Sequence, residues 1–173
     1  MRHTYAAGVA IATTVLLAGT GSTYAVGTHA QPLVRHTAAS AGTQIPTQRQ
    51  IAALFDRWNA TLATGDAHRV TDLYAPNAVL LPTVSARIRT NPAAIADYFE
   101  HFLESKPVAK IQQRFINVLG PTSAVDTGLY QFTLTNKDGR KTIVNARYTF
   151  VYELIAGRWL ITNHHSSTLP TGG

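Results

Sequence analysis

The hydrophobic side chains of this chain change their spacing at Pro107, and this change sets the class of fold. Before Pro107 they recur every three or four residues, as on one face of a helix, and after it every second residue, as in half-buried strands. Helices followed by a run of strands predict an α+β domain, with the helices on one face of a curved antiparallel sheet. Such a sheet and its helices enclose a cone whose mouth is a natural pocket.

Three helices are expected in the first half of the domain. Thr47 is suited to cap the first helix, and Gln50 completes a capping box. Its apolar stripe consists of Ile51, Leu54, Phe55, Trp58 and Leu62. A shorter helix begins at Asp66, and Asn91 followed by Pro92 forms a cap and first-turn pair for the third.

The remaining apolar segments predict strands. A short strand, residues 78–83, precedes the third helix, and four longer strands cover residues 109–120, 124–136, 142–154 and 158–169. Glycine-containing loops at Asn136–Gly139 and Ile155–Gly157 join them as hairpins, because glycine accepts the positive φ that tight turns need.

The first 30 residues have the pattern of a secretory signal peptide. Arg2 is followed by an uncharged apolar run, Ala6 to Gly21, and then by small residues ending at Ala25 and Ala30. A membrane anchor is the alternative, but the run is rich in small residues and no basic stop follows it. We therefore expect cleavage, a secreted or extracytoplasmic location, and no stable membrane insertion of the mature chain.

A flexible linker is expected over residues 31–46, which are rich in Ala, Thr, Ser and Gly without a period. The folded domain is then residues 47–170, long enough for one core but not for two domains. The absence of cysteine excludes disulfides, so the domain must rest on its hydrophobic core.

The composition and motifs of the chain also limit which classes of ligand and cofactor are expected. The net charge is +6, but the basic residues are scattered rather than gathered in a stripe, so no nucleic-acid partner is expected. The sequence has no glycine-rich loop of the kind that binds the phosphates of nicotinamide or flavin nucleotides. We therefore expect no cofactor. No metal site is predicted either, because no histidine or acid stands at useful spacing to the pair His164 and His165.

The domain resembles a known superfamily through two segments above all: "YAPNAVLLPT", residues 74–83, and "GRW…HHSS…P", residues 157–170. Together with the helical stripe they resemble NTF2-like proteins, in the branch related to the association domain of calcium/calmodulin-dependent protein kinase II and to SnoaL-like proteins. The resemblance covers Gln48 to Pro170. It implies a cone that keeps a polar pocket inside and self-associates, as a homodimer or a larger ring, through its sheet. Since the residues ahead are interpreted as a signal and a linker, kinase activity is not expected.

The two adjacent histidines near the C-terminus must point to opposite faces of their strand. A three-residue hairpin loop at Ile155–Gly157 would place Arg147 opposite His165, whereas a two-residue loop would bring it beside Ser166 and His164. We favour the first, because Gly157 then takes the bulge position. The resemblance also implies that the row of alternate side chains that begins at Trp159 and includes His165 faces inward. His165 is therefore expected to face the pocket and His164 the outside.

An inward Arg147 beside His165 would need an anionic partner, because a buried guanidinium without one is costly. No inward carboxylate is apparent, which favours a small, anionic organic ligand held with Asn163, Tyr98 and Trp58. The alternative to a ligand-binding role is a structural one, in which the guanidinium of Arg147 donates hydrogen bonds to backbone carbonyls. A further row, Tyr148, Phe150 and Tyr152, is expected on the outer side of the sheet as the self-association surface.

Two functions follow from these expectations. The first is a secreted module that binds a small ligand in a polar pocket and self-associates. The second is a small-molecule enzyme of the kinds found among NTF2-like relatives: an isomerase, dehydratase, cyclase or oxidoreductase. In that case His165 is the general base, and Arg147 or Tyr98 stabilises an enolate oxygen. No catalytic set is assigned beyond this, since a carboxylate to orient the histidine is missing from the pattern.

The signal-peptide pattern makes a direct prediction about the mature chain. Mass spectrometry of the exported protein should show a new N-terminus near Val26 or Gln31, because peptidases cut after small residues such as Ala25 and Ala30. An intact Met1 recovered from membrane fractions would contradict export and favour the anchor.

Overall fold

A computed structural model of the chain describes residues 44–170, so the predicted signal peptide and most of the predicted linker lie outside the described residues. The elements, in order, are α1 (Gln48–Leu62), α2 (Ala67–Thr71), β1 (Tyr74–Leu81), α3 (Pro92–Leu103), β2 (Val108–Val118), β3 (Ser123–Thr135), β4 (Lys141–Ile155) and β5 (Arg158–Thr168). The predicted α+β class is confirmed. Among the described helices, none is long and apolar enough to cross a membrane.

The helices begin at the residues that the sequence predicts. Thr47 caps α1: its hydroxyl accepts from the backbone N–H of Gln50, and the Gln50 side chain accepts from the backbone N–H of Thr47. Asp66 caps α2, and Asn91 caps α3 with Pro92 in the first turn. Side-chain oxygens thus satisfy backbone donors that the first helical turn leaves without a partner.

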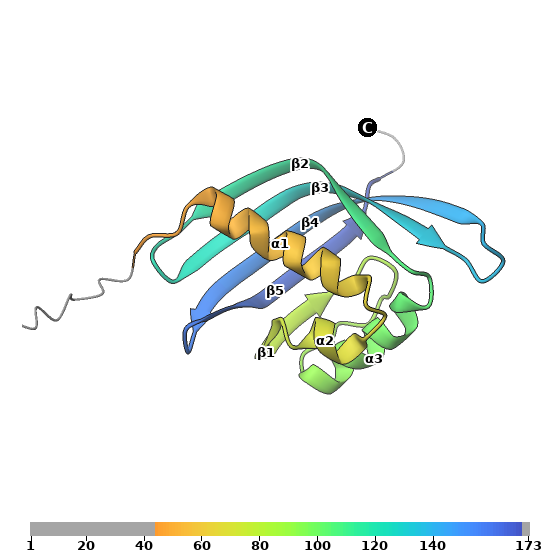
Figure 1. Cartoon of the computed structure of the whole chain (residues 1–173), viewed down its shortest axis with the longest axis horizontal. Coiled ribbons are helices and arrows are strands. Elements are labelled where there is room, and N and C mark those ends of the chain that lie inside the picture. Colours follow the sequence, from red (N-terminus) through yellow and green to blue (C-terminus); the bar gives the residue numbers. More distant parts are fainter. Residues whose placement is uncertain (1–43, 171–173) are drawn as a thin grey trace, which may run out of the picture. The chain divides into compact units, whose positions relative to one another are not determined.

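All five strands form one curved sheet in the order β1-β5-β4-β3-β2 (Figure 1). β1 runs parallel to β5, and the other neighbouring strands are antiparallel. α1 lies across the hollow side of the sheet, while α2 and α3 lie beside β1 at one end of it (Figure 1). The core between helices and sheet is unusually aromatic: the rings of Phe55 and Trp58 lie 5.9 and 5.2 Å from the ring of Phe150.

The aromatic row of β4 faces this core rather than the solvent. Tyr148, Phe150 and Tyr152 are 2%, 0% and 1% exposed. The expectation that they form an outer association surface is therefore wrong. Their partners are the aromatic side chains of α1, and burying such large rings against each other contributes more than burying the alternative row of Arg147, Thr149 and Val151.

The hairpin between β4 and β5 has a two-residue turn, not the three-residue loop we favoured. Ile155 pairs with Arg158, and the turn residues Ala156 and Gly157 have φ values of 48° and 76°. Positive φ at both central positions is the geometry that matches the twist of a tight hairpin.

A bulge in β5 then changes which residues face inward. Tyr152 pairs with Ile161 and Val151 with Asn163, so Thr162 is an extra residue on β5. Ahead of the bulge, Ile161 shares the inner face with Tyr152, as expected for the Trp159 row. Beyond it the phase switches, because one inserted residue moves every later side chain to the other face.

Beyond the bulge, His164 is therefore buried and His165 is exposed. The prediction that His165 faces the pocket and His164 the outside is wrong. Neither expected register holds, since Arg147 pairs with Ser167 rather than with His165 or Ser166.

Candidate functional site

His164 belongs to a chain of buried hydrogen bonds inside the cone. The indole Nε1–H of Trp58 donates to the hydroxyl of Tyr74 at 3.1 Å, and this hydroxyl lies 2.9 Å from Nδ1 of His164. An indole can only donate, so the Tyr74 hydroxyl accepts from Trp58 and donates its O–H to Nδ1 of His164. Nδ1 of His164 is thus the acceptor, and in the neutral ring the proton sits on Nε2.

Burial keeps this ring neutral. His164 is 3% exposed, and its ring stacks on Phe150 with centroids 3.9 Å apart. Desolvation, with a smaller effect from nearby His165, lowers the pKa of His164 to about 3. Nε2 has no hydrogen-bond partner and is buried. His164 therefore presents an N–H donor, not a base, to the interior.

The space inside the cone is almost filled. The cavity that His164 lines, together with Trp58, Tyr98 and Ser166, has a volume of about 10 Å³, room for about one water molecule. The hydroxyl of Tyr130 donates to Oγ of Ser166, which also bonds the hydroxyl of Thr83. These three hydroxyls satisfy one another, and a cavity of about 10 Å³ has no room for an organic ligand.

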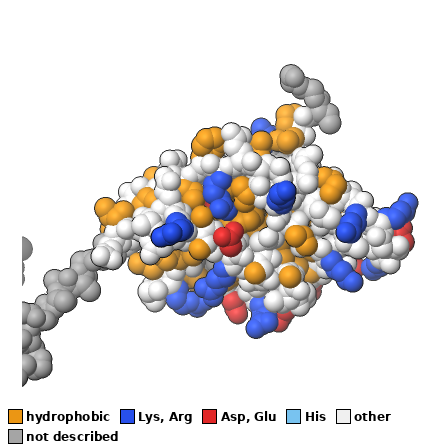
Figure 2. All heavy atoms as spheres, turned by 45° about the horizontal axis from the view of Figure 1, so that its top comes forward, with side chains coloured by type: hydrophobic (Ala, Val, Ile, Leu, Met, Phe, Trp, Pro, Cys, Tyr) orange, Lys and Arg blue, Asp and Glu red, His pale blue; other side chains and the backbone are white. Residues whose placement is uncertain are grey.

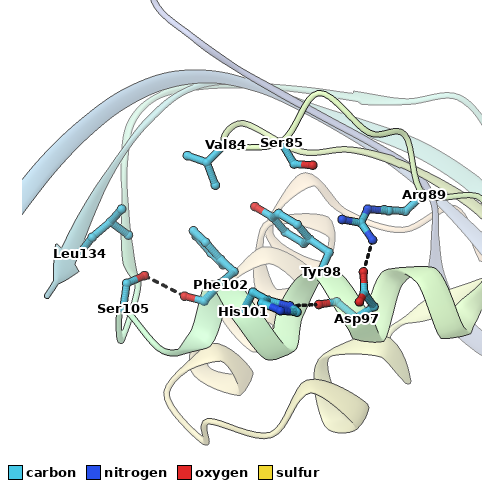
Figure 3. A pocket seen from close by; sticks show the side chains of 9 residues that line it. All are labelled: Val84, Ser85, Arg89, Asp97, Tyr98, His101, Phe102, Ser105 and Leu134. Carbon is cyan, nitrogen blue, oxygen red and sulfur yellow. Dashed lines mark hydrogen bonds and ion pairs between the residues drawn. The ribbon is translucent and has the colours of Figure 1, made fainter. Parts of the chain in front are cut away.

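A larger pocket lies outside this cavity, along α3 (Figure 3). This α3 pocket has a volume of about 450 Å³. It is lined by Val84, Ser85, Arg89, Asp97, Tyr98, His101, Phe102, Ser105 and Leu134. Tyr98 and Phe102 also line the inner cavity, so these two rings form the wall between the two spaces.

Arg89 is the buried charge of the α3 pocket. The residue is 8% exposed, and its backbone is held by a pair of hydrogen bonds to Leu80 of 2.8 and 2.9 Å. Its Nη1 donates to the carboxylate of Asp97 and to the carbonyl of Ala94. Nε is buried without a partner, and the other terminal nitrogen points toward the space above the ring of Tyr98 (Figure 3).

The neighbours of Arg89 tune the charge of this pocket. Hydrogen bonding from Arg89 holds the pKa of Asp97 below its usual range, so this acid stays ionised. A hydrogen bond from Nδ1 of His101 to the backbone carbonyl of Asp97 raises the pKa of His101. Burial raises the pKa of Tyr98 well above its usual value, which keeps its hydroxyl protonated as a donor. The pocket thus joins an apolar wall to a cationic and hydroxylic end.

The site residues predicted from the sequence fall on opposite faces of the sheet. Trp58 and Tyr98 lie on the inner side, whereas Arg147, Asn163 and His165 lie on the outer face. Arg147 and His165 do line one hollow together, of about 460 Å³, with Phe115 and Leu129 among their neighbours. We call this the outer hollow. Arg147 and His165 thus share a hollow on the outer face, but they are not the opposed inward pair that the sequence predicted.

An inward carboxylate exists where none was expected. Asp126 on β3 is 0% exposed, and its Oδ1 accepts from the hydroxyl of Tyr148 at 2.9 Å. Its Oδ2 lies 3.3 Å from Nε of Arg114. Desolvation raises the pKa of Asp126 despite these partners. The alternation of side chains along β3 could have predicted that Asp126 points inward, because Asp126 lies an even number of residues from the buried Tyr130 and Phe132.

Arg89 was the functional residue that sequence reasoning missed. It lies between β1 and α3, outside any periodic segment, so no pattern assigns its direction. Its contact with Asp97 depends on how the preceding loop returns to α3, which only the folded chain defines.

The comparisons with known proteins agree with this architecture. The family model of the calcium/calmodulin dependent protein kinase II association domain matches residues 47–170. The chain belongs to this family. The expected resemblance to NTF2-like proteins, in the branch of this association domain, is confirmed. No curated protein matches the chain in sequence.

Solved structures support both the family and the fold. A Xanthomonas campestris protein assigned to the same association domain is 57% identical, with a TM-score of 0.71, over 72% of this chain and 89% of that one. An NTF2-like superfamily protein of Salmonella enterica is 21% identical, with a TM-score of 0.63, over 72% and 92%. A scytalone dehydratase-like protein of Novosphingobium aromaticivorans is 13% identical, with a TM-score of 0.63, over 70% and 83%. The last two show the fold alone.

The neutral state of His164 makes a prediction about stability and pH. In the unfolded chain this histidine takes up a proton below about pH 6.5, whereas the folded chain resists protonation down to about pH 3. Stability should therefore fall as pH falls through this window. His164→Gln should remove this contribution, and the free energy of unfolding should then depend less on pH between 6 and 4, by up to about 1.4 kcal/mol per pH unit.

The measurement is denaturant unfolding of wild type and variant at several pH values. His165→Gln is the matched control, because it removes the adjacent, exposed imidazole and should keep the wild-type slope. Parallel curves for wild type and His164→Gln would contradict a neutral, proton-resistant His164.

Proposed function

We propose that this domain is a self-associating module and that copies of it meet through the outer face of the sheet. Membership of an association-domain family supports self-association. The observation that points to this face is Phe115, which is 56% exposed in the middle of β2; Leu129 on the adjacent strand β3 and Val151 on β4, the next strand along, are partly exposed. An apolar surface of this kind on a sheet is stabilised when a partner covers it.

The polar residues of the same face suit the rim of such an interface. Arg147 and His165 line the outer hollow with the apolar side chains, and Asn163 pairs with Val151 across β4 and β5. These polar residues offer hydrogen bonds without a buried charge pair. Stable interfaces commonly combine an apolar centre with a polar, wetter rim. The partner is a second copy of this chain, and the assembly is a homodimer or a larger ring.

Replacing Phe115 with Asp should separate the copies. The carboxylate would lose its water in the interface without gaining a partner, which raises the dissociation constant by at least about 100-fold. Light scattering at micromolar concentration should show a smaller mass than wild type, with the thermal melt of the separated chains still cooperative.

Ile88→Asp is the matched control for this experiment. Ile88 is 54% exposed but lies in the segment between β1 and α3, away from the outer face. Its variant should keep the wild-type mass. Monomeric wild type, or equal dissociation by both variants, would overturn the proposed surface.

A second activity, binding of a small organic acid, is proposed for the α3 pocket. The specific observation is Arg89, a buried guanidinium with a donor that has no partner, which lies over the ring of Tyr98, whose hydroxyl stays protonated as a second donor to the pocket. A carboxylate there would accept from both groups, and the apolar wall of the pocket would hold a ring. Asp97 pairs with Arg89 and formally balances its single charge, which favours a monoanion over a more highly charged ligand.

The enzyme alternative has less support. His165, the proposed general base, lies on the outer face, and His164 is neutral beside a cavity too small for an organic substrate. Enzymes need their base within hydrogen-bond reach of the reacting proton. Similarity to a dehydratase-like protein at 13% identity indicates a shared fold and is not evidence for a shared reaction.

Benzoate and its neutral analogue benzamide are suitable probes of the α3 pocket. Benzoate should raise the melting temperature more than benzamide at equal concentration, because only the carboxylate pairs with Arg89. Tyr98→Phe removes one donor to the charged group and should weaken benzoate binding about tenfold.

Tyr152→Phe serves as the matched control, because the Tyr152 hydroxyl is buried and has no partner, so its loss should leave benzoate binding unchanged. Loss of the benzoate effect in Arg147→Gln, but not in Tyr98→Phe, would place the ligand in the outer hollow instead.

Export through residues 1–30 completes the proposal, supported by the uncharged run and the small residues after it. A module of this kind would assemble and bind its ligand outside the cytoplasm.

A further inference from the structure

A third hollow lies where the end of α1, the helix α2 and the start of β5 meet. Its volume is about 420 Å³. It is lined by Arg57, Ala60, Thr61, Thr64, Arg69, Asp72, Leu73 and Arg158. We call it the arginine hollow. None of its residues belongs to the α3 pocket or to the outer hollow.

Three arginines reach this hollow from separate elements. Arg57 is on α1, Arg69 on α2, and Arg158 is the first residue of β5. Nη2 of Arg158 donates to the backbone carbonyl of Asp72 at 3.1 Å, which holds one of the three side chains against the hollow. On the face drawn in Figure 2, some Lys and Arg side chains lie apart among hydrophobic ones, and several others gather at the lower left.

The positive charge of the arginine hollow is not neutralised by the protein. The four ion pairs of the described residues use Arg89, Arg114, Lys137 and Arg140 as cations, and none of the three arginines of the hollow. Asp72 is the one acid among the lining residues, so three positive charges face one negative charge and leave a net charge of +2. Like charges gathered in this way repel one another, and a bound anion would relieve that repulsion.

Helix dipoles do not explain this gathering. A cation in the last turn of a helix is stabilised by the negative end of the dipole. Arg69 stands in the last turn of α2, but the last turn of α1 has no basic residue, so Arg57 lies outside it. Arg158 is on a strand. Two of the three arginines therefore have no such reason to be where they are.

We propose that the arginine hollow binds the phosphate or sulfate group of a small organic ester. The guanidinium group presents N–H donors in a planar fork that matches the oxygens of such groups. The hydroxyls of Thr61 and Thr64 donate to backbone carbonyls, so the arginines supply the donors for the anion. Ala60 and Leu73 add apolar wall, and the volume is that of a pocket for an organic ligand rather than a bare ion.

Phenyl phosphate, phenyl sulfate and phenol test this proposal by calorimetry on the full chain at low salt. The two esters should bind and phenol should not, since it lacks the anion. Arg57→Gln, Arg69→Gln and Arg158→Gln should each weaken binding about tenfold or more, because each removes a charge-assisted hydrogen bond. Arg49→Gln is the matched control: it makes the same change of charge at an exposed position near the start of α1 and should leave binding nearly unchanged.

Asp72→Asn keeps the proposal testable even if an arginine variant folds poorly. Removal of the one carboxylate in the hollow should tighten ester binding several-fold, a gain that misfolding cannot produce. An equal loss in Arg49→Gln would mean attraction to the overall charge and would overturn the site. Equal affinity for inorganic phosphate and phenyl phosphate would overturn the organic ester, leaving an adventitious ion only. Benzoate binding in the α3 pocket is independent of each of these results.

Discussion

The aromatic contact between α1 and β4 is the interaction on which the rest of the structure depends. Phe55 and Trp58 meet Tyr148 and Phe150 across the hollow side of the sheet, with ring centroids 5.2 to 5.9 Å apart. Rings of this size bury a large area, so this contact decides which face of β4 turns inward. Every neighbouring strand must follow that choice, because paired residues share a face.

The bulge at Thr162 on β5 then selects the residues that reach the interior. Without it, Asn163 and His165 would continue the inward row of Trp159 and Ile161. With it, His164 enters the aromatic core, where its Nδ1 accepts a hydrogen bond from the hydroxyl of Tyr74. One inserted residue thus exchanges a solvent-exposed imidazole for a neutral, buried one.

The filled interior moves the candidate chemistry to the outside of the cone. Inside, packed side chains leave a cavity of only about 10 Å³ beside the unpartnered Nε2 of His164. The α3 pocket, the outer hollow and the arginine hollow differ in character. The first joins an apolar wall to one ion-paired arginine, the second is an apolar face with a polar rim, and the third holds arginines without an ion-pair partner among the described residues. A self-associating domain with several separate surfaces is consistent with this distribution.

The sequence by itself determined the elements and the class of fold. Capping by Thr47, Asp66 and Asn91 is local chemistry, and the change of period at Pro107 needs no tertiary contact to be visible. The family could also be identified from the sequence, because the motifs that indicate it each lie within one short segment of the chain.

Only the tertiary structure decided which residues share a site. The phase of β5 depends on a bulge that leaves no mark on the hydrophobic pattern, and the phase of β4 depends on rings that α1 supplies from about 90 residues away along the chain. The direction in which the Arg89 side chain points depends on how the segment between β1 and α3 folds back toward α3. Distances in space between residues far apart in the sequence set burial, charge and pKa, and these are properties of the packed molecule.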